Sequence, residues 1–364
     1  MNYFRLVSFV CGAVLYAISF DGLAKEKIHA LYIPLADHYP GLVAHHKYSD
    51  SMTEADYSVE MMKSWPSLKG KFLSGQADVA FIVSPLAMNM YAESPTFKWV
   101  SLIHRDGSAL AVNDKFLESV NLSESRADRK PHADFANAAA SWKRETGKGS
   151  VSGVPSLEAT HTLVLYKYLK DHGKVLSLGR GDGDVVAKSV APPKSPAFIQ
   201  GQDERGVAAS FEQSLPWADV VETGGFGKVV WYSKDVLQWP NGHVECIIIA
   251  SNDAIKNKSE ALKEVISAIH KAGIDIDVAM SEGGQKLDAI ASIIHENYID
   301  LHSPSAIKSS LNAELGVINY VNLNNDEEGL DLIMGLALES GVMKNEIDID
   351  QFSDNSFSTK ITEK

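Results

Sequence analysis

Residues 75–85 read Gly75-Gln76-Ala77-Asp78-Val79-Ala80-Phe81-Ile82-Val83-Ser84-Pro85: a polar turn, five apolar residues in a row and a Ser-Pro pair. A continuous apolar run of this length is typical of a strand buried on both faces, as in a parallel sheet. Proline directly after serine favours the start of a helix, which we expect to continue through Met90. A buried strand followed by a helix is the repeating unit of an α/β fold.

The same alternation continues on both sides of this segment. A strand over residues 27–33 ends at Pro34, and a helix is expected from Pro40. Ser64-Trp65-Pro66 combines a serine cap with proline in the first helical turn, which predicts a second helix start. Further strands are predicted at residues 57–59, 98–103, 109–112, 151–154, 206–211 and 244–250, with helices at 133–144, from Pro155 to Gly173, and at 261–271, 284–298, 305–315 and 330–338. This rhythm predicts doubly wound α/β lobes.

A chain of 364 residues exceeds the size of a single compact core, so we expect two lobes. The first lobe is predicted to comprise residues 25–109 and 244–364, and the second lobe residues 110–243. Crossover strands near Val112 and Val244 would join them, and the helices after residue 252 would wrap the first lobe.

Residues 1–24 have the layout of a signal peptide. Arg5 provides a positive charge, Leu6–Phe20 form an apolar core, and Gly22-Leu23-Ala24 places small residues where a signal peptidase cuts. The apolar core is shorter than the ~20 residues that a membrane-spanning helix needs. We therefore predict export to the periplasm and cleavage near Ala24.

Charge and cysteine content exclude several classes of function. The net charge of −13 argues against binding to nucleic acid or to an anionic membrane surface. Cys246 is the only cysteine after cleavage, and its apolar surroundings predict an inert packing residue. The 12 histidines include no pair at helical metal-binding spacing, and no G-x-S-x-G motif occurs. The expectation is therefore no metal, no cofactor and no catalytic residue.

Candidate ligand-binding residues lie in the turns that follow predicted strands, because open α/β sheets bind ligands beyond the carboxyl ends of their strands. Several of these turns lead into helix N-termini, which favour an anion. Each aromatic or histidine residue also has an ordinary structural interpretation, Trp65 as a core residue, His161 as a satisfied helix histidine and Tyr39 as packing between lobes. The candidates are Asp37, His38, Tyr39, Trp65, Ser84 and, in the second lobe, His161.

Several of these motifs resemble a known group of proteins. Residues 75–80, the helix that carries Thr160-His161-Thr162, and the segment Gly224-Gly225-Phe226-Gly227-Lys228 are similar to those of periplasmic solute-binding proteins of ABC transporters, of the nitrate/bicarbonate/sulfonate/taurine and thiamine-precursor type. The resemblance covers nearly all of the mature chain. It implies a type II periplasmic binding protein fold, a small-molecule ligand and an ABC permease in the inner membrane. It also adds two ligand-binding candidates, Trp217 and Lys228.

The resemblance leaves the ligand open. Some relatives read Glu-Pro-Trp where this chain has Leu215-Pro216-Trp217, and Phe81-Ile82-Val83 offers no polar side chain for a small oxyanion such as nitrate. These departures disfavour nitrate, but the sequence does not decide between nitrate, bicarbonate, a sulfonate, a phosphonate and a pyrimidine. A sensor that feeds a membrane kinase would use the same pocket. An enzyme of the thiamine-pyrimidine type would need a cysteine-rich cluster that this chain lacks. We expect a monomer.

Overall fold

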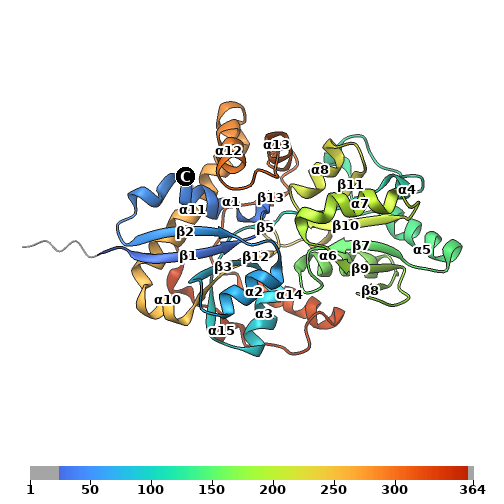
Figure 1. Cartoon of the computed structure of the whole chain (residues 1–364). Helices are drawn as coiled ribbons and strands as arrows, with labels where there is room; N and C mark the ends of the chain where they lie inside the picture. The colour runs from blue at the N-terminus through green and yellow to red at the C-terminus, as the bar shows by residue number, and fades with distance from the viewer. Residues whose placement is uncertain (1–23, 360–364) are drawn as a thin grey trace, which may run out of the picture.

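The computed structural model describes residues 24–359, which form two α/β lobes lying side by side (Figure 1). The apolar core of the expected signal peptide lies outside the described residues, so its assignment stays a prediction. Within residues 24–359, every helix is too short or too polar to cross a membrane.

The first lobe is built on a five-stranded sheet in the order β2-β1-β3-β12-β4. β1 runs parallel to β2 and β3, whereas β12 returns antiparallel between β3 and β4. Every residue of β3 is buried, as its apolar run predicts. The strands are β1 (Glu26–Tyr32), β2 (Ala55–Met61), β3 (Val79–Val83), β4 (Phe97–Leu102) and β12 (Cys246–Ser251).

Helices cover both faces of this sheet (Figure 1). α11 packs on α1 and contacts β1 and β2, whereas α2 and α3 contact β3. α2 begins as predicted, with the Ser64 hydroxyl accepting a hydrogen bond from the Ser67 amide and Pro66 in the first turn. The helices of this lobe are α1 (Tyr39–Tyr48), α2 (Trp65–Leu73), α3 (Ser84–Glu93), α10 (Asn252–Asn257), α11 (Ser259–Glu282), α12 (Gly284–Asn297), α13 (Pro304–Ser310), α14 (Glu327–Ser340) and α15 (Ile349–Phe352).

The second lobe has a six-stranded sheet in the order β11-β6-β10-β7-β9-β8. β10 is antiparallel to β6 and parallel to β7. The strands are β6 (Ser108–Val112), β7 (Ser150–Val154), β8 (Leu176–Leu178), β9 (Val185–Ser189), β10 (Ala209–Ser214) and β11 (Lys228–Tyr232). The helices are α4 (Asp114–Leu117), α5 (Asp134–Thr146), α6 (Thr160–Asp171), α7 (Ser195–Asp203), α8 (Trp217–Thr223) and α9 (Ser233–Val236).

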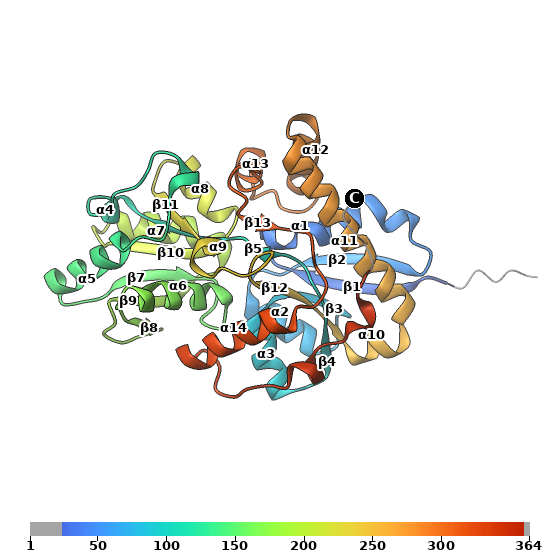
Figure 2. The same cartoon turned by 180° about the vertical axis from the view of Figure 1, so that it is seen from behind.

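Two connections join the lobes at their centre (Figure 2). The outward connection passes from β4 through β5 (Arg105–Asp106) into β6, and the return leads from α9 into β12. They lie side by side, since the Asp106 amide donates to the His243 carbonyl at 3.1 Å. β5 also pairs with β13 (Ile318–Asn319). The second sheet thus starts at Ser108, and the first sheet resumes at Cys246. The lobe limits predicted from the sequence were residues 110 and 243.

Tertiary contacts move the limits of several elements. The strand predicted at residues 206–211 is Ala209–Ser214, because its polar end, Glu212 to Ser214, is fully buried. α11 does not end near residue 271 but continues to Glu282 through Gly273, where a Cβ atom would lie 2.1 Å from the Tyr320 carbonyl oxygen. This glycine therefore serves a close approach and does not end the helix.

Two further differences lie in the second lobe. β9 occupies the start of a segment in which no strand is predicted, and its β-branched residues Val185 and Val186 fit an extended backbone. α6 begins at Thr160 instead of Pro155, because Ser156 forms a local turn in which its hydroxyl accepts from the Glu158 amide and its carbonyl from the Thr162 hydroxyl.

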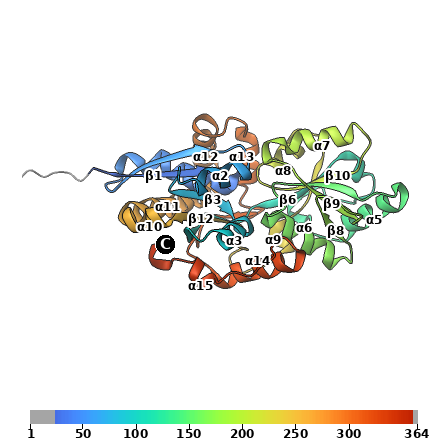
Figure 3. The same ribbon diagram turned by 60° about the horizontal axis from the view of Figure 1, so that its bottom comes forward.

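The lobes are closed on each other. The Ala36 amide donates to the Leu215 carbonyl at 2.8 Å, and Trp217 Nε1 donates to the Pro34 carbonyl at 3.1 Å. At the periphery, α14 of the first lobe contacts α6 of the second (Figure 3). The polar residues between the sheets are consequently shielded from water.

Candidate functional site

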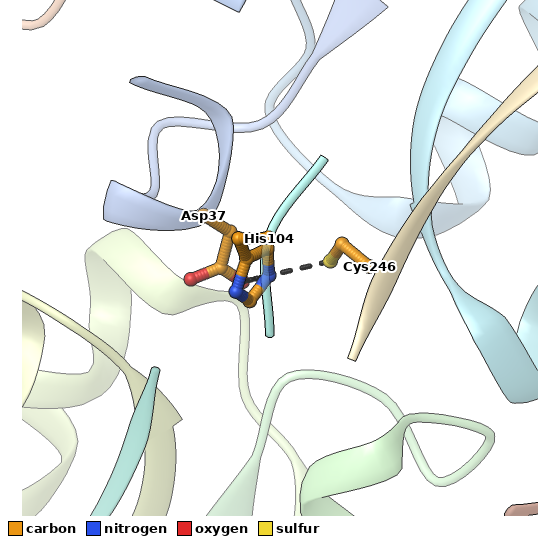
Figure 4. Close-up of side chains that lie close together, drawn as sticks. All are labelled: Asp37, His104 and Cys246. Carbon is orange, nitrogen blue, oxygen red and sulfur yellow. Dashed lines mark hydrogen bonds and ion pairs between the residues drawn. The ribbon is translucent and has the colours of Figure 1, made fainter. Parts of the chain in front are cut away.

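Three side chains of the first lobe meet beyond the carboxyl end of β3, on the side of the sheet that faces the second lobe (Figure 4). Asp37 lies in a 3-10 turn after β1, His104 follows β4, and Cys246 is the first residue of β12. Antiparallel pairing sets Cys246 opposite Val83, the last residue of β3. Cys246 therefore lies next to polar side chains at the end of β3. The sequence predicted a packing residue in apolar surroundings, and that prediction is wrong about its neighbours.

Asp37 is the centre of this group. Its side chain is fully buried, and Oδ2 lies 2.7 Å from Ser214 Oγ, 3.4 Å from His104 Nε2 and 3.6 Å from Cys246 Sγ. Oδ1 has no hydrogen-bond partner. Burial by itself would raise the pKa of Asp37, but the neighbouring imidazoles, His104 foremost, lower it to about 2. Asp37 is therefore a buried carboxylate anion.

His104 has no exposed surface, and neither of its ring nitrogens makes a hydrogen bond. Buried polar side-chain atoms in folded proteins nearly always have a partner, and each unsatisfied one costs about 1–3 kcal/mol. Nε2 of His104 has only the 3.4 Å ion-pair contact with Asp37, and Nδ1 has no hydrogen-bond partner, so the imidazole is arranged to contact something besides the protein.

The second lobe contributes Ser214 and His161 to the same cluster. Ser214 ends β10 and donates its hydroxyl proton to Asp37, while His161, in the first turn of α6, places Nε2 2.8 Å from Ser214 Oγ. His161 Nδ1 lies 3.1 Å from Glu245 Oε1. Burial lowers the pKa of His161 more than Glu245 raises it, so the imidazole is neutral. The chain from His161 through Ser214 to Asp37 links the two lobes directly.

A second chain of buried charges follows the two connections between the lobes. His243 lies 2.5 Å from Asp106 through Nδ1 and 2.9 Å from Glu245 through Nε2. Burial opposes the charge on His243, but the two carboxylates outweigh it and raise its pKa to about 10. A protonated His243 thus ties the outward connection to the return connection.

The cluster contains a further buried carboxyl group and, in the part of the chain that the structure describes, no basic side chain of lysine or arginine. Glu212 of β10 is fully buried with neither oxygen hydrogen-bonded, and burial together with the nearby Glu245 raises its pKa well above the usual range. Among residues 24–359, no lysine or arginine is hydrogen-bonded or ion-paired to Asp37, Glu212 or Glu245.

His38 and Trp65 lie beside this cluster and pack against each other. His38 Nδ1 lies 2.9–3.0 Å from the backbone oxygen and nitrogen of Ile33, and its Nε2 has no partner. Its ring meets Trp65 edge-on, with 6.1 Å between centroids. Trp65 is only 1% exposed and Nε1 has no hydrogen-bond partner. The structure therefore places Trp65 in the first-lobe core, next to the predicted ligand residues.

Tyr39 and Trp217 meet at His302 on the other side of the lobe junction. The Tyr39 hydroxyl lies 2.9 Å from His302 Nδ1, and the Trp217 ring packs edge-on against the same imidazole. Trp217 belongs to the second lobe, and Tyr39 and His302 belong to the first. These predicted residues thus contribute to the contact between the lobes.

Ser84 and Lys228 differ in their relation to the cluster. Ser84 is fully buried at the end of β3, where its amide donates to the Glu245 carbonyl at 3.0 Å and its hydroxyl has no partner. Lys228 is exposed at the start of β11, where it pairs with Val112. Val112 ends β6, and this end of the strand is distant from the two connections between the lobes. The structure does not bring Lys228 to the cluster, because the strand that follows it runs toward the first lobe.

Sequence reasoning missed several members of the cluster, namely His104, Glu212, Ser214, His243, Glu245 and Cys246. His243 and Glu245 do carry a signal: they are two residues apart in extended backbone, so they share one face just before an apolar strand. His104 likewise comes just after an apolar strand, and Asp37 follows another strand after a short turn. Glu212 and Ser214 gave no signal, because polar residues after Phe211 predict the end of a strand.

The arrangement is that of an enclosed ligand site. Charged and polar side chains from both lobes converge at the facing ends of two sheets, and many of their atoms lack partners within the described part of the chain. Open α/β sheets bind ligands in this crevice. In the closed arrangement Ser214 is hydrogen-bonded directly to Asp37 at 2.7 Å, so a small polar or cationic species would be enclosed beside this contact, against the unpartnered atoms of Asp37 and His104.

Residues 21–292 match the NMT1-like family, and the chain belongs to this family. No curated protein matches the chain. The sequence resemblance to periplasmic solute-binding proteins is confirmed, and so is the fold, because solved structures of such proteins superpose on both lobes.

Three of these structures define the fold class. A ligand-binding component of an ABC-type import system from Staphylococcus aureus, with zinc bound, has 17% identity and a TM-score of 0.71, with 92% of this chain and 98% of that chain covered. The periplasmic nitrate-binding protein NrtA from Synechocystis PCC 6803 has 14% identity and a TM-score of 0.73, with 92% and 87% covered. The alkanesulfonate-binding protein SsuA from Xanthomonas axonopodis pv. citri, bound to MOPS, has 11% identity and a TM-score of 0.61, with 88% and 95% covered.

Proposed function

We propose that this protein is the periplasmic solute-binding component of an ABC importer and that it captures a small ligand between its two lobes. The observation that carries the proposal is the buried polar cluster, to which each lobe contributes side chains. Asp37 and His104 on one lobe lie beside Ser214 and His161 of the other, with Ser214 hydrogen-bonded to Asp37, so a ligand bound to Asp37 and His104 would also lie against the second lobe. Contact with both lobes is what allows a ligand to stabilise a closed form.

The cluster also bears on the charge of the ligand. The sequence suggested an anion, because helix N-termini lie near the site. Asp37 is ionised at the centre of the cluster, and the carboxyl groups of Glu212 and Glu245 lie nearby. The Asp37 anion would repel a nitrate or a sulfonate, whereas the raised pKa of Glu212 keeps that carboxyl group protonated and able to donate a hydrogen bond, so the proposal favours a cation or a neutral hydrogen-bonding group. The relatives bind different ligands on the same fold, so their identities do not decide this point.

We propose a binding role in preference to an enzymatic one. Cys246 is the only thiol in the described part of the chain, and burial, followed by the charges of Asp37 and Glu245, raises its pKa well above the usual range. A protonated thiol is a poor nucleophile. Delivery to an inner-membrane permease follows from the family resemblance, and signalling to a membrane kinase remains the alternative use of the same pocket.

Export is the first expected result. The protein purified from the periplasm should begin near Lys25, because the segment before it has the charge, apolar core and small residues of a cleaved signal peptide. Intact-mass measurement of the secreted product checks this. Recovery of the full-length chain from the cytoplasm alone would contradict both export and the importer role.

Closure is the second expected result. A ligand that contacts both lobes should make the protein more compact, because it stabilises the closed arrangement relative to an open one. A thermal-shift panel of metal ions, amines, pyrimidines, sulfonates and nitrate would identify a ligand. A ligand present at about 100 times its dissociation constant stabilises the folded protein by about 2.7 kcal/mol. Small-angle scattering with that ligand should then show a smaller radius of gyration. A tight ligand that leaves the radius unchanged would contradict capture by closure.

A further inference from the structure

Asp37, His104 and Cys246 bring a carboxylate, an imidazole and a thiol together in one place. Each is fully buried, and their ligand atoms all lie within 4.8 Å of one another. Figure 4 shows the three side chains pointing toward one another from three separate segments. Spacing along the sequence gave no indication of this group, because its members are 67 and 142 residues apart, from 37 to 104 and from 104 to 246.

The distances match those of a tetrahedral metal site. With zinc bonds of roughly 2.0 Å to oxygen, 2.1 Å to nitrogen and 2.3 Å to sulfur, neighbouring ligands lie roughly 3.3 Å apart for O and N and 3.5 Å for O and S. In the protein, Asp37 Oδ2 lies 3.4 Å from His104 Nε2 and 3.6 Å from Cys246 Sγ. The two separations from Asp37 are therefore close to those that a zinc ion would impose, and the remaining pair, His104 and Cys246, lies within 4.8 Å.

The hydrogen bonding of the group also fits a metal. Both nitrogens of His104 and Oδ1 of Asp37 lack hydrogen-bond partners although they are buried. Ser214 donates a hydrogen bond to Asp37 Oδ2, the oxygen that faces the other two ligands. Hydrogen bonds of this kind hold a metal-binding carboxylate in its orientation. His161 holds Ser214 in turn at 2.8 Å.

We propose that Asp37, His104 and Cys246 form a binding site for a divalent transition-metal ion of the zinc type, and that this ion is the species enclosed between the lobes. The combination of thiolate, imidazole and carboxylate suits zinc better than magnesium or calcium, which take oxygen ligands. Binding replaces the S–H bond of Cys246 by a metal–sulfur bond, and the proton leaves to solvent. Three protein ligands leave a fourth position for water or for a group of the second lobe.

This inference rests on the proposed function and assigns the order of its steps. All three ligands belong to the first lobe, so the ion binds there while the lobes are apart. Ser214 and His161 then arrive with the second lobe and complete the surroundings of the bound ion. Release to a permease would require the lobes to separate again.

The test titrates chelator-treated mature protein with zinc chloride by calorimetry. We expect one ion per chain, and binding weakened by more than roughly 100-fold in Cys246→Ser and in His104→Gln, because each variant removes a ligand and not merely a residue that orients one. Ser214→Ala should weaken binding by roughly tenfold, because it removes only the orienting bond. The control is His132→Gln, which changes an exposed histidine of the second lobe and should leave the affinity unchanged.

Cobalt(II) provides a readout that needs no variant. Tetrahedral cobalt bound to a thiolate gives an intense sulfur-to-metal charge-transfer band, so the wild-type protein should show this band with one equivalent of cobalt chloride. Zinc binding that survives Cys246→Ser, or a cobalt complex without the charge-transfer band, would overturn the proposed site. This result stands even if the ligand variants fold poorly.

Scattering separates this inference from the proposed function. Zinc-dependent compaction supports both. Zinc binding at this site without compaction keeps the metal site but contradicts its role as captured cargo. Compaction with an organic ligand, together with no zinc binding, overturns the metal site and leaves the solute-binding function in place.

Discussion

His243→Gln should lower the free energy of unfolding by about 3–5 kcal/mol, which is the usual cost of removing one partner from a buried ion pair. His243 lies between Asp106 and Glu245, at 2.5 and 2.9 Å, and is 1% exposed. Glutamine keeps a polar side chain but no positive charge, so the two carboxylates would be left uncompensated at the connections between the lobes. Urea denaturation at pH 7 measures the loss.

The same residue predicts a dependence on pH. Asp106 and Glu245 raise the pKa of His243 from 6.5 to about 10 despite its burial. A histidine with a raised folded-state pKa stabilises the protein fully below its unfolded value, and this contribution is lost as the pH rises through the folded value. Wild-type stability should therefore fall between pH 6.5 and about 10, and His243→Gln should lack this part of the slope.

His132→Gln is the matched control for this comparison, because it makes the same substitution at an exposed position. It should retain both the wild-type stability and the wild-type slope. If His243→Gln unfolds at the same urea concentration as His132→Gln, the charge chain at the connections does not stabilise the protein.

Trp65→Ala should lower the free energy of unfolding by about 3–5 kcal/mol, as expected for truncation of a buried aromatic residue. Trp65 is 1% exposed and packs against His38 in the first-lobe core. Trp65→Phe should keep most of the stability, because it retains an aromatic ring and Nε1 makes no hydrogen bond that could be lost. Urea denaturation of both variants measures the difference.

Trp142→Ala is the control for Trp65, since Trp142 is a half-buried tryptophan of the second lobe and should cost less. Thermal shifts with the identified ligand add a second readout. The sequence interpretation of Trp65 as a ligand-contacting wall would be supported instead if Trp65→Ala folds with normal stability and loses the ligand-induced shift.

Local pattern was sufficient for the class of fold. The apolar run Val79–Val83 is a fully buried strand in the structure, and Ser64 and Pro66 start α2 as predicted. These features depend on periodicity and capping within a few residues, so they can be read from neighbours in the chain. Chain length added the expectation of two lobes, and the binding of ligands beyond the carboxyl ends of strands in open α/β sheets added the crevice.

Part of the candidate site could be predicted in the same way. Asp37 and His161 lie in turns that lead to helices at the carboxyl ends of strands, and topology alone directs such turns to the crevice. Lys228 was predicted from the similarity of a loop. The structure shows it exposed at the end of β11 that is distant from the first lobe. The direction of the strand decides at which end Lys228 lies, and the loop sequence does not encode that direction.

Only the tertiary structure decided which polar groups share one enclosed space. Cys246 reaches the site because β12 runs antiparallel to β3 and so begins where β3 ends. Ser214 is buried because its strand ends against the first lobe, which keeps a polar segment extended that would otherwise form a turn. Strand direction and lobe closure depend on contacts between residues far apart in the chain. Those contacts set the charge states, because neighbouring side chains keep Asp37 and His243 charged against the effect of burial, whereas burial raises the pKa of Glu212. The sequence by itself determined the lobes and the position of the crevice, whereas the chemistry of the crevice arose from their packing.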